Sequence, residues 1–370
     1  MNPYLPFPSH TLVCTACKKE YRHDEAYRFR CSCGSPYGIK DHGVSSIKKI
    51  FNGGNFFERY WQLWGIPRDT PMIGIGEGDT PIKTFAFRDR WIKAKLEYLS
   101  PTGSYKDRGA SVMVSMLMAA GVKEIIEDSS GNAGGAIAAY SSAANIDCTI
   151  YCPDKASGAK LSFIRSCGAK LMRIEGARER AAERALEKAE EMVYGSHVWN
   201  PWFMTGVRSI AYEIAQQSDI LPDEIIMPLG NGALLLGIYQ GFKDLIEARV
   251  IDRVPALIGV QADEVAPIYQ AWTGCTGTQK GSTIAEGIAN AQPPRAKEII
   301  EAIRDSRGQI IPVSEEEIKN SWQEALRRGM LIEPTSAVVL AAEMKIASQK
   351  NRLHILTGSL LKTPDMRQQI

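Results

Sequence analysis

From about residue 93 onwards, short apolar runs alternate with helical patterns, and this alternation limits the possible folds more than any other feature. Strands are predicted at 94–99, 124–128, 148–152, 170–174, 224–228, 256–261 and 354–356. Helices are predicted at 104–120, 136–144, 157–167, 177–192, 205–217, 315–328 and 336–347. A repeated strand–helix–strand order is typical of parallel sheets with right-handed crossovers. We therefore predict an α/β fold.

Two glycine-rich loops each join a predicted strand to the start of a helical segment. One is SSGNA at 129–133, called here the Asn132 loop, and the other is GNGAL at 230–234, the Gly230 loop. Glycine lets backbone N–H groups face a ligand, and a helix N-terminus favours negative charge, so both loops are candidate anion sites. Neither loop matches the P-loop or the G-x-G-x-x-G pattern. A single loop of this kind is often only a tight turn.

A lysine stands at the turn that begins the helix predicted at 104–120. The stretch LSPTGSYKDRGA at 99–110 places Lys106 shortly after Pro101 and Gly103. A lysine whose pKa is lowered by burial or by a neighbouring cation can form a Schiff base with a carbonyl. Taken alone, a Lys-Asp-Arg set is more typical of a solvated helix start. The presence of the two loops and of the Thr-Gly-Ser at 357–359 favours the interpretation that Lys106 is a reactive lysine.

Four of the eight cysteines lie near the N-terminus, in two close pairs. Cys14 and Cys17 are two residues apart in C-x2-C, and Cys31 and Cys33 follow as C-x-C after 13 further residues. Two such pairs are typical of a zinc ribbon with four thiolate ligands. The alternative is a ribbon without metal, because C-x-C departs from the usual second knuckle. The others, predicted to be small buried side chains, are Cys148, Cys152, Cys167 and Cys275.

The composition argues against several classes of partner. The net charge of +2 at pH 7 gives no electrostatic case for nucleic acid or an anionic membrane. No apolar run approaches the length of a membrane span. The first ten residues, MNPYLPFPSH, lack the basic and apolar regions of a secretory signal. We expect a cytoplasmic protein with no nucleic-acid or membrane partner.

Taken in order, these motifs resemble those of the fold type II pyridoxal-phosphate enzymes, the tryptophan synthase β-subunit family. SPTGSYKDRGA is similar to the Schiff-base lysine motif, SSGNA to the asparagine loop and GNGALLLG to the phosphate loop. The threonine synthase branch has counterparts of GEGDTP, GVQADEVAP, IAEGIA, IEPTSA, LTGS and the Cys-Ser-Cys-Gly of the leader. The resemblance implies pyridoxal 5'-phosphate and two parallel-sheet α/β domains with a small N-terminal cysteine unit.

The resemblance also implies a domain division and an assembly. It places a zinc-ribbon-like leader at 1–45, a large cofactor domain at 46–110 and 200–370, and a small α/β domain at 111–199. The expected assembly is a homodimer, and the expected partner is a small amino-acid substrate.

Each residue that matches the family's motifs receives a role from the resemblance. Lys106 would form the Schiff base with the cofactor and then remove or return the Cα proton of the substrate. Asn132 would hydrogen-bond the phenolic oxygen of the cofactor, and Thr357 would face its pyridine nitrogen. A hydroxyl there makes the ring a weaker electron sink than a carboxylate would, which favours elimination over transamination. The cofactor phosphate would bind the amides of Gly230, Asn231, Gly232, Ala233 and Leu234. The substrate carboxylate would bind Ser130, Gly131, Asn132 and Ala133.

The sequence departs from the threonine synthase pattern where that branch binds the phosphate of O-phosphohomoserine. An arginine follows Asn-Pro-aromatic in the branch, but Phe203 and Met204 follow Asn-Pro-Trp here. An apolar ring cannot pair with a phosphate dianion. Ala133 also stands where threonine is usual. These differences predict a smaller or less charged amino-acid substrate.

The expected activity is therefore a threonine synthase-like carbon–oxygen lyase that acts by β/γ elimination or replacement. One alternative is an ammonia-lyase for serine, threonine or diaminopropionate. Another is β-replacement, as in cysteine or cysteate synthesis. The alternative from a different class is a protein that binds pyridoxal phosphate and senses amino acids without turnover.

Overall fold

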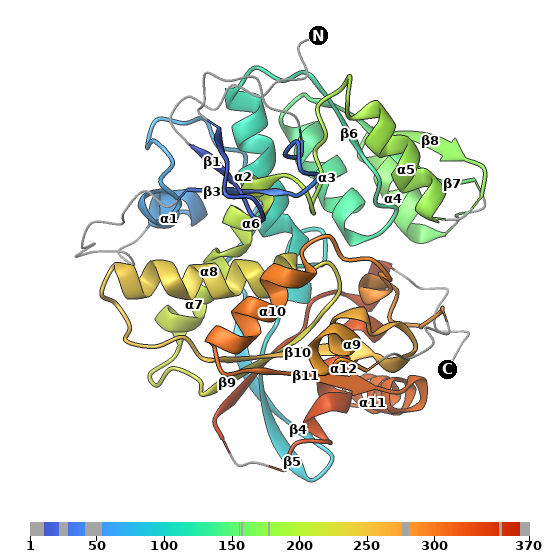
Figure 1. Cartoon of the computed structure of the whole chain (residues 1–370). Helices are drawn as coiled ribbons and strands as arrows, with labels where there is room; N and C mark the ends of the chain where they lie inside the picture. Colours follow the sequence, from blue (N-terminus) through green and yellow to red (C-terminus); the bar gives the residue numbers. More distant parts are fainter. Residues whose placement is uncertain are drawn as a thin grey trace. The chain divides into compact units, whose positions relative to one another are not determined.

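The computed structural model describes residues 11–21, 29–40, 54–154, 156, 158–176, 178–275, 281–347 and 350–362. The chain divides into two compact units (Figure 1). Unit 1 comprises Met1–Gly78 and Lys106–Val207, and unit 2 comprises Asp79–Tyr105 and Arg208–Ile370. The division expected from the sequence (1–45, 46–110 with 200–370, and 111–199) stays a prediction. One boundary between the compact units falls directly before Lys106.

The centre of unit 1 is a parallel sheet in the order β6-β7-β8. Its strands are β6 (Glu124–Glu127), β7 (Asp147–Pro153) and β8 (Lys170–Ile174). Its helices are α2 (Lys106–Ala119), α3 (Asn132–Ala143), α4 (Ala159–Ser166), α5 (Arg178–Lys188) and α6 (Pro201–Val207). Helix α5 buries only Ala181 and Ala185, as its charge pattern predicts for a solvated helix.

The N-terminal part of unit 1 forms a small antiparallel sheet in the order β2-β1-β3. The strands are β1 (Leu12–Cys14), β2 (Glu20–Tyr21) and β3 (Tyr37–Ile39). Helix α1 (Phe56–Trp64) begins at a capping box of Asn55 and Glu58 and ends at Gly65, whose φ is 66°. Its buried aromatic side chains contact one another, so this aromatic stretch packs within the chain.

Unit 2 contains a six-stranded sheet in the order β11-β10-β9-β12-β5-β4. The strands are β4 (Ile82–Phe87), β5 (Arg90–Lys95), β9 (Glu224–Pro228), β10 (Ala256–Ala262), β11 (Gln309–Val313) and β12 (Arg352–Ile355). All neighbours are parallel except β4 and β5, which form a hairpin. The strand predicted at 94–99 is therefore placed too late: β5 ends at Lys95, and Glu97–Leu99 is a 3-10 turn. The cause is the hairpin, which pairs 90–95 with 82–87.

The helices of unit 2 cover this sheet. They are α7 (Ser209–Gln217), α8 (Ala233–Glu247), α9 (Pro267–Thr273), α10 (Ala296–Asp305), α11 (Glu315–Arg327) and α12 (Pro334–Glu343). The single helix predicted at 205–217 is two helices, α6 and α7, which are separated at Arg208. Helix α12 begins at Pro334 rather than at residue 336, because proline suits the first helical position.

Buried ion pairs tie the strands of unit 2 to its helices. The Lys95 ammonium lies 2.7 Å from a Glu213 carboxylate oxygen and 2.7 Å from the Thr80 hydroxyl. Arg352 donates to Glu343 at 2.7 Å and to Glu224 at 2.8 Å. Such pairs persist in a core only when their hydrogen bonds are satisfied. Lys95 is therefore a structural lysine.

Two expectations from composition can be compared with the described residues. None of the helices among them is long and apolar enough to cross a membrane. Cys148 and Cys152 are buried as predicted, whereas Cys167 is half-buried and Cys275 is exposed. Cys275 lies directly after the helix-ending Gly274, in a polar and glycine-rich stretch, so the prediction that it is buried is wrong.

Candidate active site

Lys106 is the first residue of α2, at the end of the turn that the sequence predicted. The two charged residues after it, Asp107 and Arg108, are completely buried, while Lys106 is half-buried. The interpretation of these three residues as a solvated charge cluster is therefore wrong. A lysine that is partly withdrawn from water meets one of the conditions for Schiff-base chemistry.

The phenyl ring of Phe203 covers one side of the Lys106 amine. The Lys106 Nζ lies 5.5 Å from the ring centroid, within the range of a cation–π contact. The ring is held by close packing of α6 on α2: a Cβ at Gly109 would lie 2.6 Å from two ring carbons. A Cβ at Gly206 would lie 2.0 Å from the Arg108 carbonyl oxygen. Two glycines therefore let these helices approach closely enough to fix Phe203 beside the lysine.

The Asn132 loop joins β6 to the start of α3. Ser129 and Ala133 are buried, and Ser130, Gly131 and Asn132 are half-buried. The Gly131 amide donates to the Ser129 hydroxyl at 3.3 Å. The first amides of a helix have no acceptor within it, so the start of α3 can receive a carboxylate.

The buried carboxylate of Glu77 connects α2 to α3. It accepts hydrogen bonds from Ser111 of α2 at 2.7 Å and from Tyr140 of α3 at 2.6 Å. The Ile75 amide also donates to it, at 2.9 Å. The turn-rich GEGDTP hexamer by itself predicts only a loop, but its glutamate positions both helices that carry candidate site residues. The sequence signal is a single acid between two glycines, and both glycines have positive φ.

In unit 2, the Gly230 loop runs from the fully buried β9 to the start of α8. Gly232 has φ 89°, and a Cβ there would lie 2.4 Å from Ile299. A Cβ at Gly230 would lie 3.0 Å from the Ile288 Cα. Asn231 accepts a hydrogen bond from the Asn290 amide, which fixes the loop between the two glycines. This is a backbone cradle whose amides suit a phosphate.

Thr357 follows β12 and is buried in unit 2. Its hydroxyl lies 3.1 Å from the Ser336 hydroxyl, and its carbonyl accepts from the Tyr105 amide at 3.1 Å. Burial, and then the charge of Glu333, raise the pKa of Tyr105. The phenol next to Lys106 in the chain is therefore protonated at neutral pH.

The predicted residues fit pyridoxal phosphate when each unit is considered separately. In unit 1, a half-buried lysine lies beside an aromatic ring, and a helix start carries Asn132. In unit 2, Gly232 keeps the cradle of the Gly230 loop open, because any side chain there would occupy it. Thr357 provides a neutral hydroxyl. The Lys106 amine suits the cofactor aldehyde, the backbone amides of the Gly230 loop suit its phosphate, and the Thr357 hydroxyl suits its ring nitrogen.

A second group of polar residues, which the sequence did not single out, lies at the end of β6. The His197 Nδ1 is 2.7 Å from Oε1 of Glu127, and the Tyr194 hydroxyl donates to Asp128 at 2.7 Å. The segment that carries both partners runs beside β6: the Ile126 amide donates to Val193 at 3.0 Å. Burial, and then the charge of Asp128, raise the pKa of Glu127 well above its usual value. Burial, and then the charge of Lys106, lower the pKa of His197.

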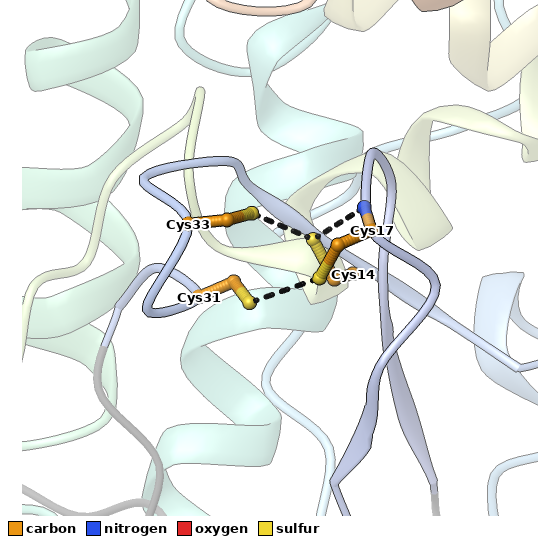
Figure 2. A group of neighbouring side chains, drawn as sticks. All are labelled: Cys14, Cys17, Cys31 and Cys33. Atoms are coloured by element: carbon orange, nitrogen blue, oxygen red, sulfur yellow. Dashed lines mark hydrogen bonds between the residues drawn. The ribbon is translucent and has the colours of Figure 1, made fainter.

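The four cysteines of the leader come together at one point (Figure 2). Their sulfur atoms all lie within 4.8 Å of one another. The Cys14 and Cys33 sulfurs are 3.4 Å apart, and those of Cys17 and Cys31 are 3.6 Å apart. Four thiolates at zinc–sulfur distances of about 2.3 Å on a tetrahedron have similar sulfur–sulfur spacings. The cluster fits a structural zinc, so the C-x-C knuckle does not prevent the geometry.

We expect purified protein to contain about one zinc ion per chain and a Cys31→Ser variant to lose it, because three thiolates hold zinc more weakly than four. Metal analysis after dialysis measures this. Cys275→Ser, which removes an exposed thiol outside the cluster, is the control. Equal metal content in both variants, or no metal in the wild type, would contradict a zinc ribbon.

Comparison with known proteins defines the family. The family described as "Pyridoxal-phosphate dependent enzyme" matches residues 73–358, and the chain belongs to this family of pyridoxal-phosphate-dependent enzymes. It is 30% identical to the threonine synthase of Methanocaldococcus jannaschii, over 95% of this chain and 93% of that protein. It is also 30% identical to a threonine synthase of Mycobacterium tuberculosis, over 80% of this chain and 85% of that protein.

Solved structures share the fold. The serine racemase of Dictyostelium discoideum has a TM-score of 0.61 at 24% identity, over 76% of this chain and 92% of that chain. A threonine deaminase from T.th. has a TM-score of 0.63 at 21% identity, with the same coverage of 76% and 92%. The predicted fold type II architecture and the predicted cofactor, pyridoxal phosphate, are confirmed.

Proposed function

We propose that this enzyme is a threonine synthase-like lyase whose substrate is a non-phosphorylated amino acid, which is the substrate class that the ammonia-lyase alternative names. The observation that carries the substrate class is the Phe203 ring beside Lys106, completely buried against Gly109. In the threonine synthase pattern an arginine occupies this sequence position. A buried phenyl ring offers no charge-assisted hydrogen bond to a phosphate dianion, whose desolvation would then be uncompensated.

Arg208, the nearest arginine along the chain after Phe203, is engaged elsewhere. Its guanidinium lies 3.3 Å from both carboxylate oxygens of Asp244 in a largely buried ion pair. Releasing it would leave Asp244 with an uncompensated buried charge, which is costly. This supports a substrate without a phosphate group.

The proposed roles of the site residues follow their chemistry. Lys106 binds the aldehyde carbon of the cofactor and moves the Cα proton of the substrate, and Asn132 hydrogen-bonds the cofactor ring oxygen. When bound, pyridoxal phosphate supplies an electron sink that stabilises negative charge at the substrate Cα. Thr357 faces the ring nitrogen as a neutral partner. The Gly230 loop, residues 230–234, binds the phosphate, and residues 130–133 bind the substrate carboxylate.

A substrate panel tests this function. We expect serine, threonine or 2,3-diaminopropionate to give an α-keto acid and ammonia, because these side chains carry no phosphate for Phe203 to exclude. Assays for α-keto acid, ammonia and inorganic phosphate measure the outcome, with protein free of cofactor as the control. Rapid phosphate release from O-phosphohomoserine with threonine as the product would contradict the proposed substrate class.

The same panel separates the alternatives. β-Replacement would make product formation depend on an added nucleophile such as sulfide. A non-catalytic sensor would change its visible absorption with an amino acid but release no product. A homodimer and a cytoplasmic location stay predictions from the sequence.

A further inference from the structure

We propose that His197, held by Glu127, donates the proton that the leaving group of the substrate needs, so that the substrate carries an unactivated hydroxyl or amino group on its side chain. This inference rests on the proposed function and names the substrate class of the same site. It makes His197 a catalytic residue and Glu127 its positioning residue.

The geometry of the pair leaves one imidazole nitrogen for a ligand. Glu127 is 0% exposed and binds Nδ1 of His197 at 2.7 Å, whereas His197 retains 8% exposure. Nε2 of His197 forms no hydrogen bond within the part of the chain that the structure describes. A carboxyl group that hydrogen-bonds one ring nitrogen fixes the orientation of the imidazole and determines whether the other nitrogen carries a proton.

The imidazole lies near the reactive lysine. The Phe203 ring contacts His197 edge-to-face with centroids 6.0 Å apart, and Lys106 Nζ lies 5.5 Å from the same ring. The two groups therefore border one phenyl ring, and their charges interact: Lys106 lowers the pKa of His197 after the larger effect of burial.

The surroundings determine how many protons the pair holds. Burial penalises both the Glu127 carboxylate and the His197 imidazolium. Asp128 disfavours the carboxylate further, while the backbone amides of Asp128 and His197 and the charge of Lys106 favour it to a smaller extent. The positive charges of Lys106 and Arg178 disfavour the imidazolium. The arrangement favoured by these effects is a protonated Glu127 that donates to Nδ1, with the remaining imidazole proton on Nε2. That proton is the one a leaving group can receive.

The proposed step balances in atoms and charge. Lys106 takes the Cα proton, and the Cα–H electron pair becomes the Cα–Cβ double bond. The Cβ–O bond breaks with its electron pair on oxygen, which takes the proton from Nε2 and leaves as water. Nδ1 takes the proton of Glu127. The new ammonium at Lys106 is balanced by the new carboxylate at Glu127.

The need for an acid distinguishes substrate classes. Phosphate leaves as a stable anion without a proton, whereas hydroxide and an amine anion are poor leaving groups that require one. A buried proton donor that borders the same Phe203 ring as the lysine therefore favours serine, threonine or a diamino acid over a phosphorylated substrate. A side-chain amine leaves in the same way when it takes the Nε2 proton.

The test compares two leaving groups on one carbon skeleton. We expect His197→Asn to lower kcat/KM for L-serine by about 10²- to 10⁴-fold, the usual contribution of general acid–base catalysis. For β-chloro-L-alanine, whose chloride leaves without a proton, the loss should stay below about 10-fold. Glu127→Gln should likewise lower kcat/KM much more for L-serine than for β-chloro-L-alanine. Equal losses for both substrates would show a structural role and overturn the inference.

A binding measurement gives a readout that does not depend on turnover. α-Methylserine and 2-aminoisobutyrate lack a Cα proton and differ only in the hydroxyl. We expect the wild type to bind α-methylserine about five-fold more tightly, as one hydrogen bond provides. His197→Asn should remove most of that difference, as followed by the visible absorption of the cofactor. A preference that is unchanged in the variant would contradict contact with the hydroxyl.

The controls separate this inference from the proposed function. Wild-type protein that shows no visible band with pyridoxal phosphate, or no turnover of any amino acid, contradicts the proposed function itself. Turnover of β-chloroalanine but not of serine, threonine or diaminopropionate contradicts only the inference. Thermal melts establish that the variants fold, and Glu127→Gln decides the outcome if His197→Asn does not.

Discussion

The Lys106→Ala variant is expected to lose the visible absorption band that pyridoxal phosphate gives with the wild type. An alanine has no amine to bind the cofactor aldehyde and no base to take the Cα proton, so turnover should fall by at least about 10³-fold. Absorption spectra and initial rates on the same preparations measure both effects.

Lys123→Ala is the matched control, because Lys123 is an exposed lysine of the same unit. It should keep both the band and the rate. A Lys106→Ala protein that keeps the band would show that another lysine binds the cofactor.

The Gly134→Ala variant should lose cofactor binding and stability together. A Cβ at Gly134 would lie 1.7 Å from the Ser129 carbonyl oxygen, a backbone atom that cannot rotate away. The Ser129 end of the Asn132 loop must then move away from α3, at a cost of about 1–3 kcal/mol of unfolding free energy or more. Urea unfolding gives the stability, and titration with pyridoxal phosphate gives the affinity.

Gly135→Ala makes the same change one residue later in the same helix. There the nearest atoms are side-chain carbons of Phe163 at 3.3 Å, which can shift by a few tenths of an ångström. Alanine also favours a helix more than glycine does. If the two variants unfolded alike, the close approach of α3 to Ser129 would not matter for the loop.

Local patterns were sufficient for several strands and for the turns that carry site residues. The strands at 170–174 and 224–228 have the predicted bounds, because each is a short apolar or alternating run between clear breakers. Helix α2 begins at Lys106, two residues later than predicted, and α8 begins at Ala233; both follow glycine-containing turns that the sequence displays directly.

Long-range pairs were not accessible in the same way. Glu127 and His197 are 70 residues apart, and Glu77 reaches Tyr140 across 63 residues. A buried acid is hydrogen-bonded by whichever partner the tertiary fold brings to it. Single-sequence patterns carry no such information, and the two acids at the end of β6 were the only available signal.

The central claim is that Lys106 holds the cofactor, and borohydride reduction followed by peptide mapping tests it most directly. Reduction of the protein loaded with pyridoxal phosphate should leave a phosphopyridoxyl group on the peptide that contains Lys106. Lys95, completely buried in its ion-pair cluster, should stay unmodified. A label on Lys95 or another lysine, or no label at all, would contradict the account.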